Sequence, residues 1–337
     1  MAEGILHSSP RKKQQHNPSI KLTAKPYLCT TMKVHWGLEH IPPIHGAVLT
    51  IGIFDGVHGG HRRILERIRQ NARDTHGESV ILTFHPHPRS VLGGTPVPLL
   101  QTPEEKIQTL EALGIDHLII VPFTAAFAGM PASVYVRDVL INPIHPKRII
   151  IGYDHQFGKN REGNYRLLEQ VSKQYGFDLE EITAEEINDC AISSTQIRNA
   201  LNEGDVSSAA QLLGRPYSIS GVVVHGEQRG RLLGFPTANL QVSHSDKLIP
   251  ANGVYVVETM CDGMLFRGMM NIGHQPTFHA VQSQKLEVHV IDQALDLYGK
   301  NLTIRFLGRL RNEHKFGSRD ELVAQLERDK AQAKDWK

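Results

Sequence analysis

Two histidines separated by two glycines are the residues of this chain whose types and spacing point most directly to chemistry. They are His58 and His61, at the end of residues 48–61, which read VLTIGIFDGVHGGH. The apolar pattern predicts a buried parallel strand over residues 48–54, a tight turn, and a helix that begins at His61. Backbone N–H groups, the positive end of a helix dipole and two imidazoles would then surround one small volume. We therefore expect the turn to hold an anion such as a phosphate.

Two other interpretations of the histidine pair stay open. As metal ligands, His58 and His61 lack a third partner at a recognisable spacing, so zinc is weakly supported. A plain turn with surface histidines is the structural alternative. The phosphate interpretation is favoured because glycine lets the backbone close on a ligand and imidazole can donate hydrogen bonds to phosphate oxygens.

A second candidate for anion binding is the stretch ISSTQIR, residues 192–198. Its hydroxyl residues Ser193, Ser194 and Thr195 come just before a predicted short helix, and Arg198 lies one turn further in. Helix capping alone would explain one hydroxyl. Three hydroxyls, free N–H groups and a guanidinium together suit the phosphates of a nucleoside triphosphate. The chain has no GxxxxGK[ST] pattern, so we expect the nucleotide to be bound without a Walker loop.

The elements that must position these residues alternate between strand and helix. Alternation of this kind predicts an α/β fold with a doubly wound parallel sheet covered on both faces. Ligands of such sheets bind at the carboxyl ends of the strands, where GIFDGVHGGH, TFHPHP and IGYDHQFG all fall. Thr102, Pro103 and Glu105 form a capping-box pattern at one helix start. The predicted strands are 47–54, 80–84, 118–121 and 149–151, and the predicted helices are 61–73, 103–113, 131–141 and 164–175.

The chain becomes rich in short strands after Pro216, so a domain boundary is expected near residues 214–217. Clustered short strands divided by Gly, Asn and Asp predict a small antiparallel β-barrel. A last helix is expected to start at Ser318, with Glu321 completing a capping box. The predicted strands are 217–225, 253–260, 265–271, 285–291 and 302–310.

Residues 221–240, which read GVVVHGEQRGRLLGFPTANL, are the candidate phosphate-binding stretch of this second half. Its glycines, with Arg229 and Arg231, could cradle phosphates, or they could belong to an ordinary exposed hairpin loop. Thr237 and Asn239 are close enough to share a hard cation such as Mg²⁺ through oxygen ligands.

Two charged residues further on have both a functional and a structural interpretation. In KLEVHVID, Glu287 alternates with apolar residues, so it lies either on a solvated face or in a polar site as a general base. Arg311 follows the last predicted strand and could reach a phosphate or simply solvent.

Composition bounds the class of protein. The 337 residues suit two domains, and the net charge, 37 − 35 = +2, makes no case for a nucleic-acid or anionic-membrane partner. Cys29, Cys190 and Cys261 lie far apart without a CxxC, which argues against a disulfide framework or a zinc site. No apolar run approaches the roughly 20 residues of a spanning helix, and no secretory signal is recognised, so a cytoplasmic protein is expected.

Residues 1–31 are basic, with little apolar periodicity. A disordered extension is favoured on composition over a targeting or RNA-binding arm. Translation from Met32 is a third possibility, and the sequence does not choose between them.

The first half resembles the nucleotidyltransferase superfamily, since GIFDGVHGGH and ISSTQIR correspond to its HxGH and SSTxIR motifs. With TFHPHP, TPEEKIQTLEALGIDHLIIVPF and IGYDHQFGKNREGN, the stretch is similar to the FMN adenylyltransferase module of bacterial bifunctional FAD synthetases. The resemblance implies a Rossmann-like fold and an ATP site at His58, His61, Ser193, Ser194, Thr195 and Arg198. It also implies nucleotide or flavin contacts at Gly52, Phe54, Asp154 and Phe157.

The first half differs from the family pattern at two positions. The family usually reads GxDFxFG, whereas this chain has His155 at the first Phe position, and His85 stands where the family often has an acidic residue. A histidine can still present a flat ring to the pocket.

The second half resembles the riboflavin kinase module, through GVVVHGEQRGRLLGFPTANL, NIGHQPTF, LEVHVID and LYGKNLTIRFLGRLRNEHKF. PTAN is the specific element: the resemblance implies that Thr237 and Asn239 hold Mg²⁺–ATP and that Glu287 activates the ribityl hydroxyl of riboflavin. Gln275, before the proline of NIGxxPTF, departs mildly from the family. Further nucleotide or flavin contacts are implied at Gly226, Arg231, Gly234, Phe235, Pro236 and Arg311.

Together these patterns predict a bifunctional enzyme of FAD biosynthesis. Residues 32–214 would adenylylate FMN to FAD with release of pyrophosphate, and residues 215–337 would phosphorylate riboflavin to FMN with ATP. The alternative is a riboflavin kinase with an inactive, flavin-binding regulatory first domain. The expected partners are small molecules, with no nucleic acid and no membrane, and the oligomeric state is not indicated.

Overall fold

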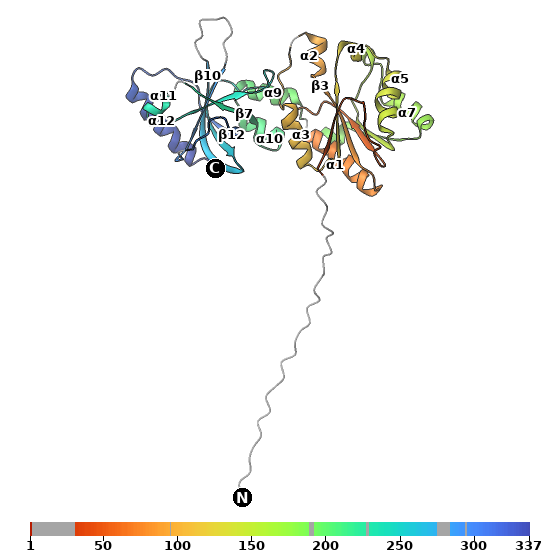
Figure 1. The fold of residues 1–337 in the computed structure, drawn as a ribbon, viewed down its shortest axis with the longest axis horizontal. Coiled ribbons are helices and arrows are strands. Elements are labelled where there is room, and N and C mark those ends of the chain that lie inside the picture. Colours follow the sequence, from red (N-terminus) through yellow and green to blue (C-terminus); the bar gives the residue numbers. More distant parts are fainter. Residues whose placement is uncertain (2–30, 95, 189–191, 227–228, 275–283, 294) are drawn as a thin grey trace. The chain divides into compact units, whose positions relative to one another are not determined.

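A six-stranded parallel sheet occupies the first half of the chain in the computed structural model, which describes residues 1, 31–94, 96–188, 192–226, 229–274, 284–293 and 295–337 (Figure 1). The strand order is β1-β4-β3-β2-β5-β6, and every neighbouring pair is parallel. The order reverses between β2 and β5, and the crevice at such a reversal is where doubly wound sheets bind ligands. The strands are β1 (Lys33–Trp36), β2 (Val48–Ile51), β3 (Ser79–His85), β4 (His117–Pro122), β5 (Arg148–Gly152) and β6 (Asp178–Ile182).

Helices cover both faces of this sheet, as the alternation of elements predicts. On one face Val48, Ile81 and Leu118 pack against Leu65 and Leu110, which belong to helices α1 and α3. On the other face the alternate strand residues pack against α5, η1 and α7. The helices are α1 (Gly59–Asp74), α2 (Pro88–Gly93), α3 (Pro103–Ala112), α4 (Ala125–Ala128), α5 (Ala132–Tyr135), η1 (Val136–Ile141), α6 (Asn142–Ile144), η2 (Lys159–Arg161), α7 (Tyr165–Tyr175), α8 (Ala184–Asn188), α9 (Ser194–Glu203) and α10 (Val206–Leu213).

The turn that follows β2 differs in extent from the prediction. The strand ends at Ile51 rather than at residue 54, and the helix begins at Gly59, with His58 as its N-cap residue. Phe54, Gly56 and Val57 all have positive φ angles, so the chain coils back on itself instead of continuing the strand. The extra loop residues place His58 and His61 on the first turn of α1.

The second half of the chain is a closed antiparallel barrel, which confirms that prediction. The strand order around the barrel is β10-β11-β8-β7-β12-β9, and β8 is a strand that the sequence analysis did not identify. The elements are β7 (Ser218–Val224), α11 (Arg229–Leu232), β8 (Ala238–Val242), β9 (Gly253–Cys261), β10 (Met264–His274), β11 (Gln284–Val290), β12 (Asn301–Arg311) and α12 (Arg319–Lys334).

Both expected helix caps are present in some form. Thr102 and Glu105 make the complete capping box at the start of α3. At α12 the hydroxyl of Ser318 accepts from the N–H of Glu321, whose carboxylate accepts from Gly317 instead of closing the box on Ser318.

Residues from Thr31 to Lys337 form one compact unit. Ile197 and Leu213, from α9 and α10, share a buried apolar cluster with barrel residues such as Ile304. The domain limits at 32–214 and 215–337 therefore stay a prediction. The expectations for the 1–31 extension, Cys29, Cys190 and Gln275 lie outside the described residues.

No helix in the part of the chain that the structure describes is both long and apolar enough to cross a membrane. The cytoplasmic location stays a prediction.

Gly158, in the loop after β5, supplies a test of how tightly this loop packs. Its φ is +74°, and an added Cβ would lie 2.7 Å from the Cα and 2.9 Å from the backbone N of Ala132. Gly176 has a similar φ of +73° and no atom within 4 Å of an added Cβ. We expect Gly158→Ala to lower the free energy of unfolding by about 3 kcal/mol and Gly176→Ala by about 1 kcal/mol, measured by urea denaturation. Equal losses for both variants would contradict the tight packing of this loop.

Candidate active sites

His58 and His61 lie ring against ring at the start of α1. Their ring centroids are 3.8 Å apart, and the ring of Phe54 lies 5.1 Å from that of His61. The Nδ1 atoms of both histidines are buried and have no hydrogen-bond partner among the described residues. Buried polar atoms are normally paired, so two unpaired imidazole nitrogens at a helix N-terminus suit a bound anion.

Burial keeps both imidazoles neutral at neutral pH. It lowers the pKa of His58 to about 4, against an opposing effect of Asp55. It also lowers the pKa of His61 well below its ordinary value, and the nearby His58 and Lys106 lower it further. Each ring therefore enters the site as a neutral hydrogen-bonding group.

The start of α9 lies beside this turn, and Asp55 joins the two. The carboxylate of Asp55 pairs with Nη2 of Arg198 at 2.5 Å, and its backbone carbonyl accepts from the hydroxyl of Ser194 at 3.0 Å. Ser193 is the helix cap, as the structural interpretation of that hydroxyl proposes, because its Oγ accepts from the N–H of Gln196. Thr195 is exposed. The structure thus brings the two candidate anion-binding stretches together.

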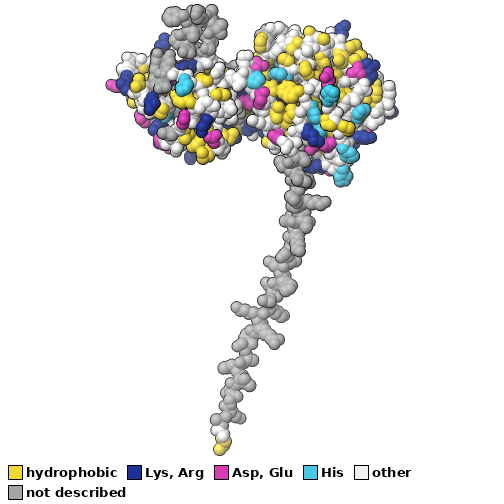
Figure 2. All heavy atoms as spheres, in the orientation of Figure 1, with side chains coloured by type: hydrophobic (Ala, Val, Ile, Leu, Met, Phe, Trp, Pro, Cys, Tyr) yellow, Lys and Arg dark blue, Asp and Glu magenta, His cyan; other side chains and the backbone are white. Residues whose placement is uncertain are grey.

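An aromatic cavity of about 510 Å³ lies at the ends of the strands, beside the residues that follow β2. The expected residues Gly52, Asp154 and Phe157 line it, and so does His155. Phe54 does not, because it is fully buried beneath Gly52 and packs against His61. In Figure 2 hydrophobic side chains gather on the visible face over α2 and β3, which contribute to this cavity. Further aromatic lining comes from Phe84, Phe123, Phe127 and Tyr135.

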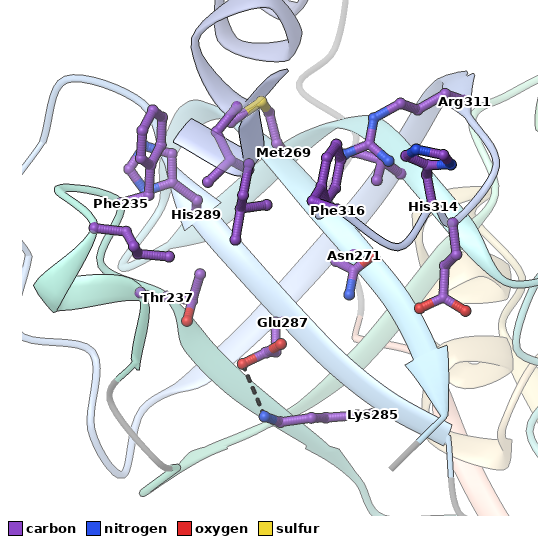
Figure 3. Close-up of a pocket in the computed structure, with 16 residues that line it drawn as sticks. Phe235, Thr237, Met269, Asn271, Lys285, Glu287, His289, Arg311, His314 and Phe316 are labelled. Atoms are coloured by element: carbon purple, nitrogen blue, oxygen red, sulfur yellow. Dashed lines mark ion pairs between the residues drawn. The ribbon is translucent and has the colours of Figure 1, made fainter. Parts of the chain in front are cut away.

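A second cavity, of about 430 Å³, opens in the barrel half and has a polar and an apolar side (Figure 3). Thr237, Asn271, Glu287 and Lys285 lie along one side of it, and Phe235, Met269 and Phe316 along the other. Glu287 lines this cavity with a side chain that is 25% exposed, while its neighbours Leu286 and Val288 are buried in the barrel core. Lys285 pairs with the Glu287 carboxylate at 3.1 Å.

Thr237 connects this cavity to another one. It also lines a neighbouring cavity of about 430 Å³, whose walls include Arg231, Pro236 and Tyr298. Two cavities of similar volume therefore share Thr237 as a wall. Gly226 and Gly234 belong to the candidate phosphate-binding stretch, residues 221–240. An added Cβ at Gly226 would lie 2.0 Å from Nδ2 of Asn239, so only glycine fits there. Gly234 has a φ of +83°, a conformation that favours glycine.

Thr237 and Asn239 fit the oxygen ligands that Mg²⁺ prefers. Asn239 is the cross-strand partner of Glu287 between β8 and β11, so the two side chains share one face of the sheet. Neither the Thr237 hydroxyl nor the Asn239 amide hydrogen-bonds to another described residue. Their oxygens are therefore available to a hard cation.

Arg311 lines the cavity that contains Glu287, but its guanidinium already has an ion-pair partner. Nε and Nη2 donate to the buried carboxylate of Asp329 on α12, at distances of 2.8 to 3.1 Å. The guanidinium also lies 5.7 Å from the ring centroid of Phe316. These contacts tie α12 to the cavity wall.

Comparison with known proteins shows the family to which both halves of the chain belong. Residues 41–196 match the FAD synthetase family and residues 213–337 match the riboflavin kinase family. The chain is 37% identical over 309 residues to the bifunctional riboflavin kinase/FMN adenylyltransferase of Escherichia coli strain K12, covering 90% of this chain and 98% of that protein. The chain belongs to the bifunctional riboflavin kinase/FMN adenylyltransferase family.

Other relatives extend this result. The Haemophilus influenzae member of the family is 39% identical over 293 residues, which cover 86% of this chain and 94% of that one. A solved structure of a protein described as a macrolide-efflux protein, from Streptococcus pneumoniae, has a TM-score of 0.81 and 30% identity, over 91% of this chain and 100% of that chain. The similarity in fold therefore extends through both halves of this family member.

Several residues of the two sites were not found from the sequence. Asp55 stands inside the GIFDGVHGGH motif, and an acidic residue in an anion-binding turn is a signal that it needs a cation partner. Lys285 precedes the candidate base by two residues, which places it on the same face of the strand. The aromatic residues Phe84, Phe123, Phe127 and Tyr135 carry no such signal, because aromatic residues after strands usually belong to a core.

His155, the departure from the family pattern, should make stability depend on pH. Burial lowers its pKa in the fold to about 4, against an ordinary value of 6.5. Between these values the unfolded chain binds the proton and the folded chain does not, so stability falls as pH drops from 6.5 towards 4. Replacing His155 with Phe should reduce this dependence, measured as urea-unfolding free energy from pH 4.5 to 7.5, while the other buried histidines keep their share of it. His45→Gln, at an exposed histidine, is the control, and equal slopes for wild type and His155→Phe would contradict the assignment.

Proposed function

We propose that this family member makes FAD from riboflavin in two steps, one at the barrel cavity and one at the crevice between β2 and β5. The observation that carries the proposal is that each half of the chain has a cavity beside a candidate phosphate-binding element. In the sheet half, the aromatic cavity is lined by Gly52 and Ile53, which lead from β2 into the turn that carries the two histidines. In the barrel half, the cavity that contains Glu287 shares Thr237 with a neighbouring cavity.

In the barrel, riboflavin occupies the cavity that contains Glu287, and ATP occupies the neighbouring space. The carboxylate of Glu287 takes the proton from the ribityl 5′-hydroxyl, whose oxygen forms a bond to the γ-phosphorus of ATP while the bond to the β-phosphate oxygen breaks. ADP leaves and FMN is the product. Thr237 and Asn239 hold Mg²⁺, which supplies positive charge to the transferred phosphoryl group when bound.

In the sheet half, FMN lies with its ring system among the aromatic residues of the cavity. An oxygen of its phosphate attacks the α-phosphorus of ATP, and pyrophosphate leaves, without a covalent enzyme intermediate. Neutral His58 and His61 donate hydrogen bonds to the phosphate oxygens as charge develops on them. The N-terminus of α9, with Ser194, Thr195 and Arg198, holds the rest of the triphosphate.

The alternative of an inactive, regulatory first domain has less support. Two buried imidazole nitrogens that have no partner among the described residues suit a working phosphate site better than an inactive one. The departure at His155 still presents a ring to the aromatic cavity, 5.7 Å from that of Phe157.

The two activities should separate by mutation. We expect His61→Ala to lower FAD formation at least about 100-fold while FMN formation persists, because a donor to the reacting phosphates is lost. Glu287→Ala should lower FMN formation by about 100-fold or more, with FAD formation intact when FMN is supplied. The assay incubates purified protein with riboflavin, ATP and Mg²⁺ and separates the products by chromatography, with His45→Ala as control. Wild-type protein that makes FMN but no FAD would sink the adenylyltransferase assignment and support the regulatory alternative.

The Mg²⁺ proposal makes a separate prediction about Asn239. Its replacement by Ala removes one oxygen ligand, so the Mg²⁺ concentration that half-saturates riboflavin phosphorylation should rise about tenfold or more. Gln241→Ala, two residues further along the same strand and exposed, is the matched control. An unchanged Mg²⁺ requirement in Asn239→Ala, with normal folding, would show that this residue does not hold the ion.

A further inference from the structure

Lys247 is a buried lysine in the barrel half whose charged end pairs with a residue of the sheet half. It lies in the loop between β8 and β9, and its side chain is 1% exposed. Its Nζ pairs with the carboxylate of Glu105 at 2.5 Å, donates to the carbonyl of Leu100 at 2.8 Å, and lies 4.6 Å from the ring centroid of Tyr217. Lys247 lines neither the aromatic cavity of the sheet half nor the cavity that contains Glu287.

A buried charge of this kind is costly unless it is well paired. Burial lowers the pKa of Lys247, and the adjacent Glu105 opposes this by favouring the charged form. Two apolar side chains would fill the same space without this cost, so stability alone gives little reason for the pair. The contacts of the two partners show what the pair holds in place.

The two hydrogen-bond acceptors of the Lys247 ammonium, Leu100 and Glu105, belong to the sheet half. Backbone hydrogen bonds join the same two segments: the N–H of Leu99 donates to Asp246 at 2.7 Å and the N–H of Leu248 donates to Leu99 at 2.8 Å. Glu105 also accepts from the N–H of Thr102 at 3.1 Å, within the capping box that starts α3. The ammonium of Lys247 therefore holds both a carbonyl of this segment and the carboxylate that caps the next helix.

The opposite side of the same segment faces the proposed adenylyltransferase site. The N–H groups of Leu100 and Gln101 donate to the Asp55 carboxylate, each at 3.1 Å. The carbonyl of Pro98 accepts from Nε of Arg198 at 2.8 Å, and Asp55 pairs with Nη2 of the same guanidinium. Residues 98–101 thus fix the orientation of Arg198 on one side while Lys247 fixes them on the other.

We infer that Lys247, a residue of the barrel half, is a positioning residue for the adenylyltransferase reaction: with Glu105 it holds the segment that orients Asp55 and Arg198 towards the ATP phosphates. The inference rests on the proposed role of Arg198 in binding ATP. Small displacements of a group that orients a substrate have large kinetic effects, so loss of the ammonium weakens ATP binding at this site. The kinase site, at the barrel cavity, does not use this segment.

The test is steady-state kinetics of both reactions in the full-length chain. Lys247→Met keeps the aliphatic stem and removes the charge. We expect the KM for ATP in FAD formation from FMN to rise about tenfold, with a smaller effect on kcat, while FMN formation from riboflavin changes less than about twofold. In Lys247→Arg the KM for ATP should stay close to the wild-type value, because this variant keeps the charge. Lys300→Met is the matched control, since Lys300 pairs with Asp262 at an exposed site of the same barrel.

Glu105→Gln removes the charge of the other member of the pair. It tests the positioning role if Lys247→Met does not fold. It should raise the same KM. The double variant should raise the KM no more than the larger of the two single effects, since the pair acts as a unit. An unchanged KM for ATP in folded Lys247→Met or Glu105→Gln overturns the inference, and so does a parallel fall of both activities, which indicates general destabilisation.

Arg198→Ala separates this inference from the proposed function. If Arg198→Ala leaves FAD formation unchanged, the proposed ATP site is wrong. If Arg198→Ala impairs FAD formation and the Lys247 and Glu105 variants do not, only the positioning role is wrong.

Discussion

The buried carboxylate of Asp55 is the interaction on which the arrangement of the sheet half depends. It accepts two backbone N–H groups and pairs with Arg198, and the residue is only 2% exposed. A carboxylate in such a place is stable only if all its partners are present. The turn after β2, the segment before α3 and the helix α9 must therefore assemble together, and the histidine pair is ordered as part of the same assembly.

The two halves meet the same requirement, a flavin next to a reactive phosphate, with different architectures. The parallel sheet gathers residues from the ends of several strands, so an aromatic cavity and a helix N-terminus converge at the point where strand order reverses. The barrel instead sets Asn239, Glu287 and Asn271 opposite one another on three adjacent strands. In the sheet half the first turns of two helices carry the candidate phosphate-binding groups, whereas in the barrel a strand carries the candidate base.

Local patterns were sufficient to predict the elements and the motifs that act through neighbouring residues. The 3.6-residue period placed α1 and α7, and the capping box of Thr102 and Glu105 was correct in full. The strand β8 was not predicted, because it begins inside PTAN, whose proline and asparagine are typical of a loop.

Contacts between residues far apart in the chain could not be predicted from a single sequence. Asp55 and Arg198 are 143 residues apart and Lys247 and Glu105 are 142 apart, and nothing in the local pattern of either residue names its partner. The packing of Phe54 beneath Gly52 and against His61 also joins residues whose contact the local pattern does not name.

The hydrogen bonds between residues 99 and 246–248 have an evolutionary consequence. Modules joined by a flexible linker can be exchanged between relatives without loss, but here the barrel's β8–β9 loop extends the framework of the other half. A barrel transplanted from another family member would need to bring its own matching partner segment, so the two modules are expected to be inherited together rather than shuffled independently.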